Sequence, residues 1–135
     1  MIKSKKILLP LFAFVFIGCN DTPKSAISNM YDALQNGNVV KLSNNTTETM
    51  NIALVSQSLK KCSVNKADYT DDNVKLANDC LLKEYSKLEY KNIKIIDITK
   101  NIANANVTII NNNIEKNINL VVENLDGKWR VRGRK

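Results

Sequence analysis

The spacing of the apolar residues changes after Leu88, and this change limits the folds that the chain can adopt. Before that point, apolar side chains recur at intervals of three and four, which is typical of helices. After it they alternate with polar side chains, which is typical of strands. Helices followed by strands predict an α+β domain in which one face of a sheet packs against the helices.

Three helices are predicted in the first half. The first covers about 23–36, with Thr22 as its N-cap and Gly37 at the position of a C-cap. Asn38 can cap a short segment after it, and helical spacing resumes over about 48–61. The residues that define the third helix are Asp71 and Asp72 at its start, then Val74, Ala77, Leu81, Tyr85 and Leu88.

Four strands are predicted in the second half. Two turn sequences, Asn111-Asn112-Asn113 and Asp126-Gly127, separate the last three strands. Strands joined by such short turns must be antiparallel. The predicted order is therefore α-α-α-β-β-β-β, with a four-stranded antiparallel sheet.

The N-terminal segment has the pattern of a bacterial lipoprotein signal. Three lysines precede an apolar run from Ile7 to Gly18, which is too short to span a bilayer of ~30 Å. The run ends in Phe16-Ile17-Gly18-Cys19, which resembles a lipobox, with Cys19 as the lipidated residue. We expect a signal peptide over 1–18, a lipidated tether over 19–23 and one domain over 24–135. The alternative is an ordinary secretory signal followed by an unrelated cysteine.

This pattern places the protein in the bacterial cell envelope, anchored to the inner or outer membrane with its domain in the periplasm or at the cell surface. Loss of the three lysines would lower the formal charge from +7 to +4, so the charge alone indicates no strongly anionic partner. In an exported chain, Cys62 and Cys80 are expected to form one disulfide, and two free buried thiols are the alternative. With no histidine and no second cysteine pair, no metal site is expected. No cofactor and no nucleic acid are expected either.

Four short motifs follow one another along the chain: Thr22 to Ala26, Gly37 to Leu42, Ala105 to Thr108, and Asp126 to Val131. In this order they resemble the small DUF4878-type bacterial lipoproteins of the NTF2-like (cystatin-like) superfamily. The resemblance implies a curved antiparallel sheet wrapped around helices to form a cone. It implies no activity, because the superfamily contains enzymes and non-enzymes. The segment with Cys62 and Cys80 is not part of the family pattern.

Few residues could carry catalysis. The lack of histidine excludes the usual Ser-His-Asp and Cys-His arrangements. Some NTF2-like enzymes move protons with Asp and Tyr, and the candidates of these types here are Tyr31, Asp32, Tyr85, Tyr90 and Asp97. Each fits a core or surface role as well, so we expect no catalytic activity. Three aromatic residues could instead line a ligand pocket in the cone, or simply pack in the core: Tyr31, Tyr85 and Trp129.

The last strand carries a basic stripe. Strict alternation turns Trp129 and Val131 inward and turns Arg130, Arg132 and Arg134 outward. The stripe is either a solvated strand face or a contact surface for anionic lipid, lipopolysaccharide or cell-wall polymer.

The first strand suggests the function that we favour from sequence. Alternation makes it apolar on both faces, with Ile93 and Ile95 separated from Ile96 and Ile98. One of these pairs would then be covered by something other than the helices. We therefore expect a non-catalytic module that binds a protein partner, or a second copy of itself, through the sheet face. A carrier of a small apolar ligand in the cone is the alternative, and an enzyme with an Asp/Tyr pair is a third.

Overall fold

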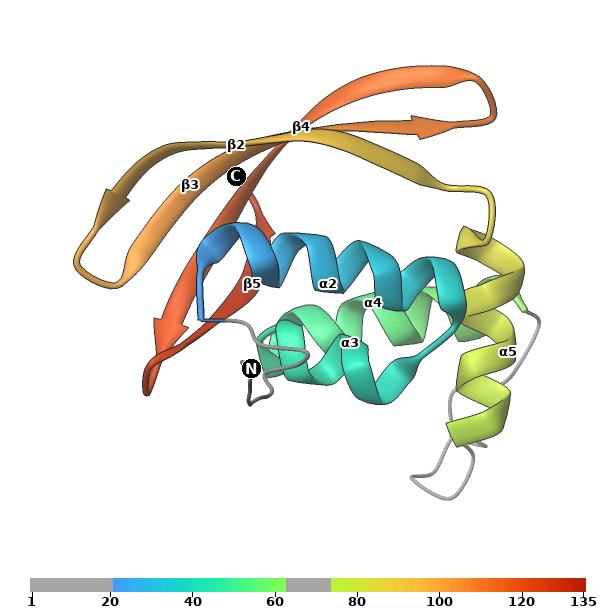
Figure 1. The fold of residues 1–135 in the computed structure, drawn as a ribbon. Helices are drawn as coiled ribbons and strands as arrows, with labels where there is room; N and C mark the ends of the chain where they lie inside the picture. Colours follow the sequence, from blue (N-terminus) through green and yellow to red (C-terminus); the bar gives the residue numbers. More distant parts are fainter. Residues whose placement is uncertain (1–20, 63–73) are drawn as a thin grey trace, which may run out of the picture.

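A computed structural model describes residues 21–62 and 74–135, in which helices precede strands (Figure 1). The elements are α2 (Pro23–Asn36), α3 (Val39–Asn45), α4 (Glu48–Lys61), α5 (Val74–Tyr85), β2 (Glu89–Thr99), β3 (Ile102–Asn111), β4 (Ile114–Leu125) and β5 (Lys128–Arg134). The α+β class is confirmed. The predicted signal peptide, Cys19 and the predicted helix start at Asp71 and Asp72 lie outside the described residues.

The described residues contain four helices, so the predicted count of three was wrong. The short segment after Asn38 is a helix of its own, α3, whose N-cap is the Asn38 side chain accepting from the Lys41 amide at 3.0 Å. This helix continues through three polar residues, Ser43, Asn44 and Asn45. Asn45 is buried, and its side-chain amide donates to the Lys41 carbonyl at 2.9 Å. A buried amide bonded to the backbone thus completes a helical turn that the apolar pattern alone does not reveal.

The ends of α2 follow the sequence closely. Thr22 caps the first turn through a capping box with Ser25. At the other end Gly37 adopts a left-handed conformation with φ of 62°. A Cβ at this position would lie 2.5 Å from the carbonyl oxygen of Asn78 on α5. Glycine is therefore needed here both for the turn and for the close approach of α5.

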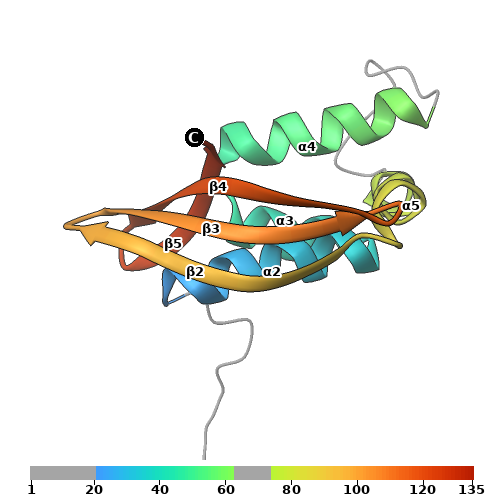
Figure 2. The ribbon, with the colours of Figure 1, turned by 90° about the horizontal axis from the view of Figure 1, so that it is seen from above.

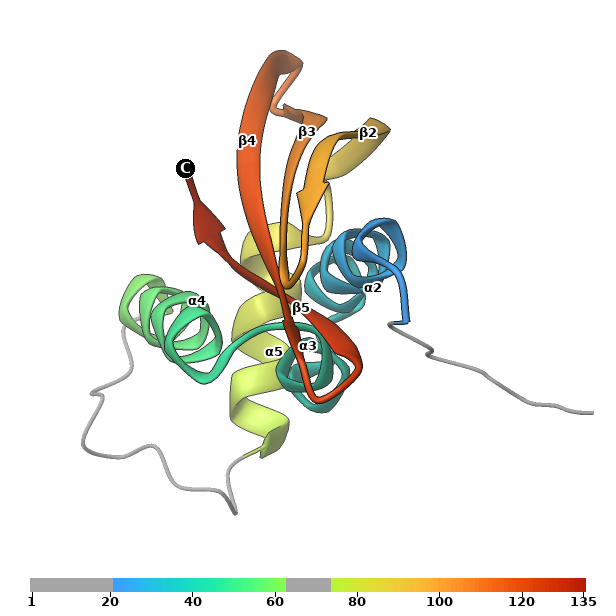
Figure 3. The same ribbon diagram turned by 90° about the vertical axis from the view of Figure 1, so that its left-hand side faces the viewer.

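The sheet has the order β2-β3-β4-β5, with all neighbours antiparallel as predicted. Both predicted turns are present as two-residue turns with positive φ, at Asn112–Asn113 and at Asp126–Gly127. Figures 2 and 3 show the sheet curving across the helices, with α2 on the β2 side and α4 on the β4 side. The core fills the space between them and includes Ile27, Leu34, Leu120 and Val131.

Strand β2 departs from strict alternation. Ile93 and Ile95 are half-buried against the core, whereas Ile96 and Ile98 are 58% and 57% exposed. The register shifts between Ile95 and Asp97, so Ile96 is an extra residue in a bulge and Ile98 pairs with Ala103. Ile96 and Ile98 are therefore both exposed in the described structure, but they do not share one regular face, because the bulge pairs Ile98 with the buried Ala103.

The predicted disulfide between Cys62 and Cys80 is present, with 5.7 Å between the Cα atoms. It joins the end of α4 to the middle of α5, where Cys80 is buried. Beside it, Glu84 accepts a hydrogen bond from the Ser58 hydroxyl at 2.8 Å and pairs with Lys61 at 2.9 Å. The bridge and this polar contact together fix α5 against α4.

Candidate ligand-binding cavity

A cavity of about 360 Å³ lies between α2, α4 and the inner face of the sheet. Its apolar lining comes from helices and strands alike: Met30, Leu34, Met50, Leu54, Leu88, Ile109 and Leu120. Its polar lining residues are Tyr31, Gln57, Tyr85, Asn111 and Arg134. Seven apolar and five polar residues thus line the cavity, and its volume is at the lower end of the ~300–1,000 Å³ that is usual for small-molecule sites.

Two of the three aromatic residues predicted to line a pocket do so. Tyr31 reaches the cavity from α2 and Tyr85 from the end of α5. Trp129 is also buried, but it is not among the lining residues, so for Trp129 the core interpretation is the one that the structure favours. Alternation along β5 predicted its burial without showing that the cavity lies elsewhere.

The two tyrosines that line the cavity have a raised pKa. Burial raises the pKa of Tyr31 to about 12, against the opposing effect of the Arg134 charge. Burial also raises the pKa of Tyr85 to about 12; the Glu84 carboxylate adds to this rise, while Ser58 and Arg134 oppose it. Both hydroxyl groups therefore stay protonated well above physiological pH, and the Tyr85 hydroxyl has a hydrogen bond with Ser58.

Arg134 reaches the cavity because β5 contains a bulge. Val131 pairs with Val122, but Gly133 pairs with Val121, so Arg132 is the extra residue. The next pair is Arg134 with Leu120, a buried residue of the inner face. Paired residues of an antiparallel ladder share a face, and the bulge therefore turns Arg134 inward.

The predicted outward stripe of three arginines is thus corrected. Arg134 lines the cavity, and Arg130 donates to the Ser43 carbonyl at 2.8 Å at the end of α3. Of the three, only Arg132 is left as an exposed side chain without such a role in the described part of the chain. Strict period-two alternation failed here, although the glycine at 133 is a known signal of a strand bulge.

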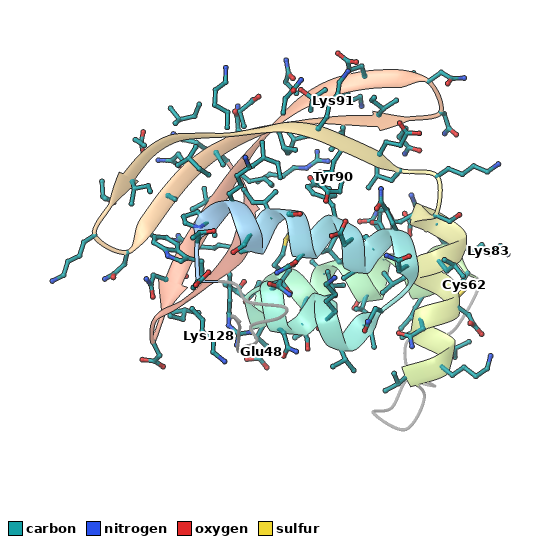
Figure 4. The ribbon with its side chains drawn as sticks, viewed as in Figure 1. Glu48, Cys62, Lys83, Tyr90, Lys91 and Lys128 are labelled. Atoms are coloured by element: carbon teal, nitrogen blue, oxygen red, sulfur yellow. A yellow bond between two sulfur atoms is a disulfide. The ribbon has the colours of Figure 1, made fainter. Side chains whose placement is uncertain are left out.

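A hydrogen-bond network lies next to the cavity and outside its lining. Tyr90 points from β2 toward α2, while its neighbour Lys91 points to the opposite side of the sheet (Figure 4). The Tyr90 ring stacks on Tyr31 with 5.4 Å between centroids. Its hydroxyl donates to Asp32 at 2.8 Å and lies 2.9 Å from the Ser28 hydroxyl. These contacts fix the ring of Tyr31, which is one of the residues that line the cavity.

The remaining acidic candidate, Asp97, lies away from the cavity. It is exposed on β2 and accepts a hydrogen bond from the side chain of Asn104 at 2.8 Å. Within residues 21–62 and 74–135, no three potential metal ligands among Cys, Asp and Glu lie together. In the same ranges, no helix combines the length and the apolar character needed to cross a bilayer.

The described residues form an α+β domain with a cavity lined by apolar residues together with two tyrosines and an arginine. No protein-family model matches the chain, and no curated protein matches its sequence significantly.

The sequence predicted Tyr31 and Tyr85 as lining residues but did not predict the part of the cavity wall that α4 forms. Met50, Leu54 and Gln57 lie on α4, and nothing in their spacing indicates that they border a cavity and not a filled core.

Proposed function

We propose that the protein is a membrane-anchored binding module of the bacterial cell envelope, and that its cavity holds a small, largely apolar molecule. The observation that carries this proposal is the cavity of about 360 Å³ between the helices and the sheet. A concave space of this size between helices and a sheet is within the range of small-molecule sites.

The wider assignment rests on the sequence. The lipobox-like Phe16-Ile17-Gly18-Cys19 supports a lipid anchor at Cys19, and the ordered motifs support membership of the NTF2-like superfamily. A curved sheet over helices, with a cavity beneath it, is in keeping with the cone that this resemblance implies. The module is proposed to be non-catalytic because no carboxylate that could act as a base is among the described residues that line the cavity.

A filled cavity tests the binding proposal. Leu54→Phe places a larger side chain in the cavity wall, whereas Ile52→Phe makes a similar change at an exposed site of the same helix. The full chain in zwitterionic nanodiscs is titrated calorimetrically with octanol, with empty nanodiscs subtracted. We expect L54F to weaken octanol binding by about tenfold and I52F to leave it unchanged. Equal binding by both variants, or no binding by the wild type, would contradict a role of the cavity.

A second candidate function, binding of a protein partner or a second copy through β2, has its own supporting observation. Ile96 and Ile98 are more than half exposed at the edge of the sheet, where β2 also has an unpaired side. Exposed apolar residues on an edge strand are a common site of strand pairing and association.

This candidate is tested with two matched variants. Ile96→Asp with Ile98→Asp removes the apolar edge, and Val40→Asp changes a side chain that is equally exposed, at 57%, on α3. Crosslinking in intact cells should yield adducts of the wild type and of V40D but not of the double variant. Adducts that persist in the double variant would rule out this edge as the contact.

A further inference from the structure

We propose that the cavity selects molecules with an anionic oxyacid group joined to an apolar body, and that Arg134 binds the anionic group. This inference rests on the proposed ligand-binding function and names the ligand class for the same cavity. It depends on the position of one charge in a lining that is otherwise neutral.

The register of β5 places the charged side chain of Arg134 at the cavity. The bulge at Arg132 pairs Arg134 with Leu120 and so places the guanidinium on the face that borders the cavity. Arg134 is both exposed and part of the lining, which locates it at the opening. A ligand entering with its apolar end first would leave its polar end beside this side chain.

The surroundings leave the charge of Arg134 uncompensated. Across the described parts of the chain, no carboxylate forms an ion pair with Arg134. The Glu84 carboxylate raises the pKa of the cavity residue Tyr85. This carboxylate already forms an ion pair with Lys61 at 2.9 Å. An anion at the opening would therefore meet a positive charge with no internal competitor.

The tyrosines reinforce this preference. Tyr31, Tyr85 and Arg134 all line the cavity, and the charge of Arg134 lowers the pKa of both tyrosines against the effect of burial. Because the tyrosines stay protonated, they add no negative charge to the lining. A guanidinium binds carboxylate or phosphate oxygens through a planar pair of donors, and such charge-assisted hydrogen bonds are stronger than neutral ones.

The size of the cavity limits the apolar body. A volume of about 360 Å³ is close to the lower limit for small-molecule sites, which suits a single short chain or ring system. Octanoate, octanol and octylammonium are therefore suitable probes, since they share one tail and differ in the charge of the head group.

The experiment compares these probes on the full chain in zwitterionic nanodiscs, with Arg134→Gln as the test and Arg132→Gln as the control. Both variants remove one positive charge from β5, but Arg132 is outside the lining. The wild type should bind octanoate more tightly than octanol, and octanol more tightly than octylammonium. R134Q should lose octanoate affinity by about tenfold or more, while R132Q should stay within about twofold of the wild type.

The outcomes separate this inference from the function on which it rests. If octanol and octanoate bind equally and R134Q changes neither, the cavity binds ligands but Arg134 does not select them, and the inference is overturned. Equal losses in R134Q and R132Q would also overturn it, because they indicate general attraction by net charge. If no probe binds, both the ligand class and the proposed function fail.

Discussion

Leu120 of β4 and Arg134 of β5 are direct partners in the antiparallel ladder, so a fully buried leucine and a cationic side chain lie on the same face of the sheet. Two residues earlier on β5, the register is shifted by one by the extra residue Arg132. Among the described residues that line the cavity, the side chain that this irregularity places there is the only charged one. The central claim about the site follows from this pairing.

The cavity tyrosines predict how stability depends on alkaline pH. Tyr31 and Tyr85 have a pKa of about 12 in the folded chain, whereas an unfolded chain releases these protons near pH 10. Between these values the unfolded state binds fewer protons, so the free energy of unfolding falls as the pH rises. Replacement of both residues by Phe should flatten this fall, measured by urea denaturation at about pH 9 and pH 11. An identical slope in wild type and variant would contradict the raised pKa values.

The disulfide predicts a loss of stability on removal. Cys62→Ala with Cys80→Ala should lower the free energy of unfolding by roughly 2–4 kcal/mol, because the unfolded chain gains freedom when the bridge is lost. Chemical denaturation of the oxidised wild type and the double variant measures the difference. Mass spectrometry of a non-reduced digest supplies the control, and free thiols at both positions in the wild type would contradict the bridge.

Gly37 and Gly127 form a matched pair for testing the contact between α2 and α5. Both have positive φ, but an added Cβ meets the Asn78 carbonyl at 2.5 Å only at Gly37 and meets nothing within 4 Å at Gly127. Gly127→Ala should cost about 1–2 kcal/mol from backbone strain alone. Gly37→Ala should cost more, because α5 must also move. Equal losses in thermal or chemical denaturation would show that the close approach of α5 contributes nothing.

The lipid anchor is tested by Cys19→Ala in a bacterial host. A chain with a lipidated cysteine should fractionate with membranes and carry an added acyl mass, and both properties should be lost in the variant. Cys62→Ala is a suitable control, since it also removes one cysteine but leaves the lipobox-like motif intact. Unchanged membrane association and unchanged processing of C19A would contradict the lipoprotein assignment.

Most of the local structure could be predicted from the sequence, but the register of the sheet could not. Thr22, Gly37 and Asp126-Gly127 act through their immediate neighbours, so their roles as caps and turn residues could be predicted from position alone. The bulges at Ile96 and Arg132 depend on pairing with other strands. One extra residue reverses the direction of every later side chain, and strict alternation therefore placed Arg134 on the wrong face.

The candidate site was predictable only in part for the same reason. Tyr31 and Tyr85 stand on clear helical stripes that had to face the interior. Whether an interior is filled or hollow depends on how helices and sheet fit together, which no spacing along one element can reveal. The cavity wall formed by α4 and the charge of Arg134 on β5 both depend on how the helices and the sheet fit together, so neither could be predicted from the sequence.

The most direct test of the account is a titration of octanoate into the full chain in zwitterionic nanodiscs, followed through the ring signals of ¹³C-labelled tyrosine and tryptophan. The account predicts saturable shifts of Tyr31 and Tyr85 in the wild type and in R132Q, an unmoved Trp129 signal, and no comparable shifts in R134Q. Shifts of equal size in R134Q, or a response of Trp129 without Tyr31 and Tyr85, would contradict an anion site formed by Arg134 at this cavity.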